Sequence, residues 1–106
     1  MAEKNILLVC NAGMSTSLLV TKMQKAADKD DITVNIAATA SPDLKNKLDE
    51  VKPDVMMLGP QVRYMEKKLA AEYDFPVKVI NMRDYGLMNG ENVLKDALAT
   101  IDAAGK

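Results

Sequence analysis

The sequence contains no histidine, no tryptophan and a single cysteine. The absence of histidine excludes catalysis by Ser-His or Cys-His pairs, zinc sites with histidine ligands and any phosphohistidine carrier. A single cysteine excludes an intramolecular disulfide bond and is typical of a reducing compartment. If the chain performs covalent chemistry, Cys10 is therefore the leading nucleophile, and it has to be activated without an imidazole.

Basic clusters and long apolar runs are missing as well. Arg63 and Arg83 are the only arginines, and the formal net charge of −1 gives no reason to expect nucleic acid or an anionic membrane as a partner. No apolar run approaches the roughly 20 residues of a membrane-spanning helix, and the N-terminus lacks the core of a signal peptide. We therefore expect a cytoplasmic protein. The length of 106 residues suits a single domain, residues 1–106.

Short apolar runs alternate with segments of helical periodicity along the chain. The runs 5–10, 55–58 and 77–80 indicate buried strands, and residues 32–38 alternate apolar and polar side chains, as an edge strand does. Four helices are predicted, and they begin at Ser15, at Ser41-Pro42-Asp43, after residues 59–61 and after a loop formed by residues 81–89.

This alternation predicts an α/β fold, a single open four-stranded parallel sheet with helices on both faces. With the first strand placed in the centre, the predicted strand order is 2-1-3-4. Ligands of such sheets bind beyond the carboxyl ends of the strands, near the switch in connection direction. The loops after Cys10, Leu58 and Ile80 are therefore expected to surround one site.

The candidate site is the segment that follows the first strand. Cys10 ends the apolar run, a short loop containing Gly13 follows, and three hydroxyl residues, 15–17, open the helix. The helix dipole, converging backbone N–H groups and the hydroxyls would each stabilise a thiolate, and they would hold phosphoryl oxygens for the same reason. This arrangement indicates a phosphoryl carrier. Its phosphate-binding loop would consist of Asn11, Ala12, Gly13, Met14, Ser15 and Thr16, with Ser17 further out.

A plainer interpretation of the same residues is open. A lone cysteine after an apolar run is frequently a small hydrophobic residue of the core. Serine and threonine also cap helices routinely, although one cap accounts for only one of the three hydroxyls. The glycine and the hydroxyl run after Cys10 favour a phosphoryl site, because a core cysteine needs neither.

The layout of strand, loop and helix resembles the small cysteine-dependent protein tyrosine phosphatases, whose loop ends in an arginine. Thr16 occupies that position here, so the loop lacks the guanidinium that would stabilise charge in the transition state. The sequence also offers no obvious general acid for an alkoxide leaving group. The missing arginine and the missing general acid favour a protein that holds a phosphoryl group for a partner over one that hydrolyses a phosphate ester.

Three stretches carry a closer resemblance. They are the run 9–20, the segment Leu58-Gly59-Pro60-Gln61-Val62 with the following Tyr64-Met65, and Asp84-Tyr85-Gly86. In these stretches the chain resembles the enzyme IIB components of the sugar phosphotransferase system, of the lactose/cellobiose (chitobiose) type.

The resemblance implies a role for Cys10 as a phosphocysteine. It would accept phosphate from a phosphohistidine of the IIA component and pass it to a β-glucoside-type sugar, of the cellobiose or chitobiose class, held by the IIC membrane permease. No cofactor or metal ion is implied. A small cysteine-dependent phosphatase and a non-catalytic interaction domain are the alternatives.

Two residues outside the loop are further candidates. Gln61 could face the phosphoryl group, or it could simply be a polar residue at the start of a helix. Tyr85 could cover the site or serve a docking surface, although Tyr-Gly is also a common turn pair.

Overall fold

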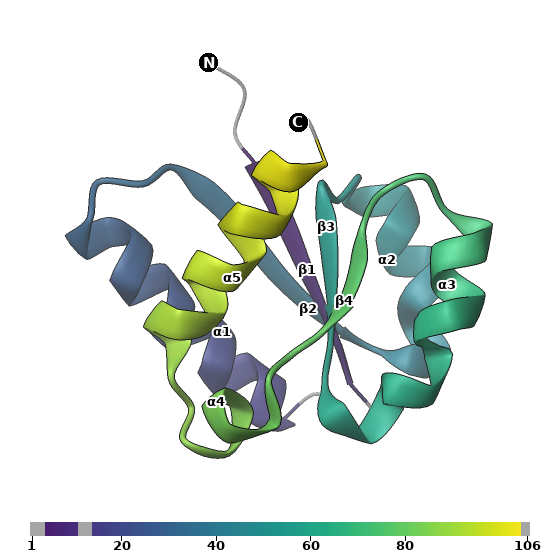
Figure 1. The fold of residues 1–106 in the computed structure, drawn as a ribbon, viewed down its shortest axis with the longest axis horizontal. Coiled ribbons are helices and arrows are strands. Elements are labelled where there is room, and N and C mark those ends of the chain that lie inside the picture. The colour runs from purple at the N-terminus through teal and green to yellow at the C-terminus, as the bar shows by residue number, and fades with distance from the viewer. Residues whose placement is uncertain (1–3, 11–13, 105–106) are drawn as a thin grey trace.

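Four parallel strands form the centre of the computed structural model, which describes residues 4–10 and 14–104 (Figure 1). The order β2-β1-β3-β4 confirms the predicted arrangement, and every neighbouring pair is parallel. The strands are β1 (Lys4–Cys10), β2 (Val34–Ala40), β3 (Val55–Leu58) and β4 (Val77–Val79).

Helices cover both faces of the sheet (Figure 1). One face carries α1 (Met14–Lys29) and α5 (Gly90–Ala103), which pack against each other. The other face carries α2 (Leu44–Glu50) and α3 (Glu66–Glu72), which follow the 3-10 turns η1 (Ser41–Asp43) and η2 (Pro60–Met65). A short helix, α4 (Met82–Gly86), connects β4 to α5.

The central position of β1 explains its continuous apolar run. Ile6 and Leu8 enter the core beneath α1 and α5, whereas Leu7 and Val9 enter the core beneath α2 and α3. Each of these four side chains is fully buried, because both faces of the strand are covered. The edge strand β2 is less buried than β1, and Asn35 is exposed, but Thr39 on the same face is buried, so the predicted wetter face covers only part of the strand.

The structure differs from the predicted elements at several boundaries. Residues 32 and 33 precede β2, and the strand continues to Ala40, two residues beyond the predicted end. The helix predicted at Ser41 begins as a 3-10 turn and becomes α-helical only at Leu44. The helix predicted after residues 59–61 likewise begins as the 3-10 turn η2, with a kink at Val62 (φ −115°, ψ 19°).

The segment 81–89 is not the plain loop that the sequence suggests, because it contains α4. The Asn81 side chain caps this helix by accepting hydrogen bonds from the backbone N–H groups of Arg83 (2.9 Å) and Asp84 (3.2 Å). A five-residue helix is too short to show an apolar period, so the cap is its main sequence signal.

Backbone hydrogen bonds between the strand ends fix the edge at which a site is expected. The N–H of Gly59 donates a hydrogen bond to the carbonyl oxygen of Val9 (2.7 Å). The N–H of Ile80 donates one to the carbonyl oxygen of Leu58 (2.8 Å). The carboxyl ends of β1, β3 and β4 therefore lie side by side. At this same end, the lower one in Figure 1, are α4 and the beginning of α1.

None of the helices in the described part of the chain is both long enough and apolar enough to cross a membrane.

Candidate functional site

Cys10 is the last residue of β1, where the central strand ends between two neighbours. Its backbone pairs with Ala40 of β2, and Val9 before it pairs with Leu58 of β3. Because side chains alternate along a strand, Cys10 points to the same face as Ile6 and Leu8, the face covered by α1. Only 3% of its surface is exposed. The thiol is therefore held at the end of the sheet close to the helix that follows it in the chain.

The turn after β3 lies directly against Cys10 because it contains a glycine. A Cβ atom added to Gly59 would lie 3.6 Å from the Cβ of Cys10 and 3.4 Å from the carbonyl oxygen of Val9. The same position is 3.0 Å from Oε1 of Gln61. The amide of Gln61 therefore folds back over Gly59, the residue that lies against Cys10, and its role toward a phosphoryl group stays a prediction.

The first turn of α1 follows Cys10 closely in sequence. Met14 and Ser15 open the helix, and the N–H groups of a first helical turn have no partner within the helix. Asn11, Ala12 and Gly13 lie outside the described residues, so their part in a phosphate-binding loop stays a prediction. Ser17 is on the exposed side of α1.

Thr16 carries a buried hydroxyl at this end of the sheet. Its side chain is only 1% exposed, and its Oγ1 has no hydrogen-bond partner among the residues that the structure describes. Burying a hydroxyl without a partner costs about 1–3 kcal/mol. A hydroxyl kept at that cost, in the first turn of the helix after Cys10, is suited to donate to an anion bound there.

We expect the Thr16→Val protein to be more stable than the wild type by about 1 kcal/mol, because valine has a similar shape and buries no hydroxyl. The same variant should accept a phosphoryl group at least about 10-fold more slowly, since one donor to the anion is lost. Urea unfolding and a labelling time course measure the two effects. In the control Thr39→Val, which removes a buried hydroxyl bonded to the Ala40 carbonyl oxygen (3.3 Å), no gain in stability is expected.

Tyr85 and Gln61 line one cavity, although they are 24 positions apart in sequence. The Tyr85 ring belongs to the core beneath α1 and α5 and is 8% exposed. The cavity has a volume of about 640 Å³ and lies between η2 and α4. The structure thus brings both outer candidates to the end of the sheet where Cys10 lies. The residues that line the cavity are Pro60, Gln61, Arg63, Tyr64, Met82, Tyr85 and Gly86.

Sequence reasoning assigned no role to Arg63, Tyr64 and Met82, although each of them lines this cavity. Tyr64 stood in one of the stretches that carry the resemblance, and Arg63 is one of only two arginines. Both were signals. The position of Met82 had no comparable signal, because it depends on the short helix α4.

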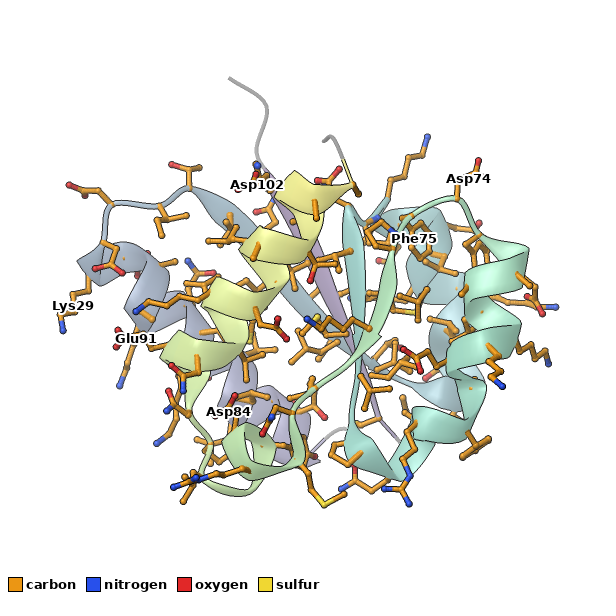
Figure 2. The ribbon with its side chains drawn as sticks, in the orientation of Figure 1. Lys29, Asp74, Phe75, Asp84, Glu91 and Asp102 are labelled. Atoms are coloured by element: carbon orange, nitrogen blue, oxygen red, sulfur yellow. The ribbon has the colours of Figure 1, made fainter. Side chains whose placement is uncertain are left out.

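The site carries a nucleophile and neutral hydrogen-bond donors but few charged groups of its own. Within residues 4–10 and 14–104, no group of three or more Cys, Asp or Glu side chains is placed to hold a metal ion. Asp84 of α4, labelled in Figure 2, lies at this end of the molecule, and its carboxylate accepts a hydrogen bond from Asn92 (3.2 Å). Such a site can bind an anion next to a thiol.

Comparison with known proteins agrees with this chemistry. Residues 5–96 match the model of the family described as "PTS system, Lactose/Cellobiose specific IIB subunit". The chain is 48% identical over 103 residues to a "PTS system galactose-specific EIIB component" of Lactococcus lactis subsp. cremoris, covering 92% of this chain and 95% of that protein. A "PTS system cellobiose-specific EIIB component" of Lactococcus lactis subsp. lactis shows the same identity and coverage.

Solved structures give the same result. The solution structure of a "cellobiose-specific phosphotransferase IIB component protein" from Borrelia burgdorferi superposes with a TM-score of 0.78 at 40% identity, covering 97% of this chain and 95% of the other. A lactose-specific IIB domain from Streptococcus pneumoniae, at 16% identity and a TM-score of 0.76, shares the fold and covers 93% of this chain and 98% of its own. The chain belongs to the lactose/cellobiose-specific IIB subunit family of the sugar phosphotransferase system, and it is a phosphotransferase component that carries phosphoryl groups in sugar transport.

Proposed function

We propose that Cys10 accepts a phosphoryl group from a phosphohistidine of a IIA component and passes it to a sugar bound by a IIC membrane permease, on the cytoplasmic side of the membrane. The observation that carries this proposal is the position of Cys10, at the end of the central strand and beside the start of α1. There the buried Thr16 hydroxyl has no hydrogen-bond partner among the described residues. A cysteine of the core alone would need no such surroundings.

The first transfer is an in-line displacement at phosphorus. The Sγ–P bond forms while the N–P bond of the donor imidazole breaks, and the proton lost by the Cys10 thiol balances the proton that the imidazole gains, so the donor leaves as a neutral histidine. The N–H groups of the first turn of α1 and the Thr16 hydroxyl stabilise the equatorial oxygens during this step. The same groups then hold the phosphoryl group until the acceptor arrives.

The second transfer moves the phosphoryl group to a sugar hydroxyl. The O–P bond forms while the Sγ–P bond breaks, and Cys10 is regenerated as a thiolate. The proton of the sugar hydroxyl has to be taken by a group of the partner, because this chain contains no histidine and the cysteine is occupied. The chain is therefore a carrier that depends on both partners.

We propose a disaccharide or glycoside with a β linkage, of the cellobiose or chitobiose class, as the acceptor. The support comes from relatives named for cellobiose, at 48% identity, and for oligo-beta-mannosides in Bacillus subtilis, at 39% over 99 residues. The galactose-specific relative of equal identity makes galactose the competing acceptor to include in the test.

The proposal is tested by reconstitution. Membranes containing a IIC permease of this type are mixed with the soluble donor proteins, phosphoenolpyruvate and labelled cellobiose, chitobiose or galactose. Labelled sugar phosphate is expected only when the purified chain is added. Sugar phosphate formed equally without the chain would argue against the carrier role, as would cysteine-dependent hydrolysis of an aryl phosphate by the chain alone.

A further inference from the structure

Four large apolar side chains are exposed around the end of the molecule where Cys10 lies. Leu18 is 50% exposed, Tyr64 74%, Met82 61% and Leu87 66%. They stand on the start of α1, on η2 and on α4 with the residue after it, the elements that surround the carboxyl ends of the strands (Figure 1). Among the described residues, no large hydrophobic side chain at the opposite end reaches comparable exposure. Two of them, Tyr64 and Met82, line the same cavity, and an exposed apolar patch of this kind is typical of a protein interface.

Both arginines of the chain stand in the same region. Arg63 precedes Tyr64 and lines the cavity beside Gln61, and Arg83 follows Met82 in α4. Both are exposed, and neither forms an ion pair with any residue that the structure describes. Four lysines elsewhere, by contrast, are paired with carboxylates. The guanidinium groups are therefore available to an outside anion.

We infer that Leu18, Tyr64, Met82 and Leu87, together with Arg63 and Arg83, bind the phosphorylated donor protein. These six residues form one surface, the collar. The inference rests on the proposed function, which supplies a donor whose phosphoryl group must reach Cys10. The collar fits a donor surface that is apolar at its centre and negatively charged around the phosphohistidine.

The positive charge of the two arginines favours the donor protein, and not the membrane permease, as the partner that binds the collar. The donor arrives with a phosphoryl anion that the two guanidinium groups attract. The cytoplasmic loops of membrane proteins carry an excess of lysine and arginine, which the same groups repel. The collar therefore promotes charging of Cys10 by the donor, and docking on the permease relies on other contacts.

The residue types suit a partner that must bind and leave repeatedly. Tyrosine and arginine are the residues whose truncation most often weakens an interface, and methionine adapts its shape to different surfaces. Tyr64 and Met82 also border the same cavity, so a donor side chain that enters it would contact both. The collar thus provides a small apolar centre with a charged edge.

The test measures the initial rate of Cys10 labelling against the concentration of purified, phosphorylated IIA donor. Tyr64→Ala and Met82→Ala are each expected to raise the KM for the donor about 10-fold and to leave kcat within about twofold, because neither side chain belongs to the strand end or the helix start that holds the reacting group. Tyr64→Phe, which keeps the ring, should retain the wild-type KM.

Charge reversal provides a second, independent arm. Arg83→Glu should lower kcat/KM about 10-fold at low salt, and the difference should shrink as salt is raised, because steering by exposed charges is screened. Lys52→Glu is the matched control: it makes the same charge change at an exposed position near the amino end of β3, and it should stay within about twofold of the wild type.

The outcomes separate the collar from the carrier function. If Cys10 is labelled and the Tyr64 and Arg83 variants keep the wild-type KM for the donor, the collar does not bind the donor. If these variants impair only the transfer to membranes containing the permease, the acceptor is the occupant and the inference is wrong. If wild-type Cys10 is not labelled even at saturating donor, the proposed function itself fails.

Discussion

Replacing Cys10 with serine is expected to abolish phosphoryl transfer while leaving the fold in place. The hydroxyl of serine is a far weaker acid than a thiol, so almost none of it is ionised at neutral pH and the nucleophile is lost. The transfer rate from a phosphorylated donor should fall by at least about 10³-fold, a loss of the size seen when an essential nucleophile is removed. Labelling by the donor measures this loss directly.

The stability of Cys10→Ser separates the site from a structural role. The thiol is 3% exposed and lies at the end of a strand, so a serine hydroxyl there should reduce the free energy of unfolding by only about 1–2 kcal/mol. Urea unfolding of the two proteins gives the difference. Loss of cooperative unfolding would show that Cys10 serves mainly the core, and labelling of the serine protein would show that another residue accepts the phosphoryl group.

Of the glycines that the structure describes, Gly90 is expected to lose the most stability when it is replaced with alanine. The new Cβ would lie 2.5 Å from the carbonyl carbon of Lys22 and 2.6 Å from the amide nitrogen of Met23. Both atoms belong to the backbone of α1, which cannot move aside without shifting the whole helix against the sheet. We expect a loss of about 2–3 kcal/mol, typical of an overpacked core.

Gly86→Ala is the matched control, because no atom lies within 4 Å of the Cβ that it would add. Thermal unfolding of the two variants should show a melting temperature lower by about 10 °C or more for Gly90→Ala, and a change of at most a few degrees for Gly86→Ala. Equal melting temperatures would mean that the start of α5 does not pack closely on α1, and the position of α1 behind Cys10 would need revision.

The sequence determined the sheet well because its signals there are local and strong. The apolar run of β1 is typical of a strand buried on both faces of a parallel sheet, and the alternation in residues 32–38 favours an edge strand. With the first strand placed in the centre, the order expected from these patterns is the one observed. The position of Cys10 at a carboxyl end follows from its place as the last residue of the apolar run. The thiol and the start of the helix after it could thus be predicted from sequence patterns alone.

Other parts depend on contacts between distant segments and could not be predicted in this way. The helix α4 has five residues and no apolar period, so its segment looked like a loop. The cavity shared by Gln61 and Tyr85 exists because η2 and α4 meet beyond the sheet. The burial of the Thr16 hydroxyl without a partner among the described residues is likewise a property of packing, which the local sequence does not show.

The most direct test of the account is the mass of the protein after incubation with a phosphorylated IIA donor. We expect an adduct of about 80 Da, located on Cys10 by fragmentation and removed by iodine, as is expected of a phosphoryl group on sulfur. Discharge of the donor with no adduct on Cys10, or with the added mass on a different residue, would contradict the claim that this thiol carries the phosphoryl group.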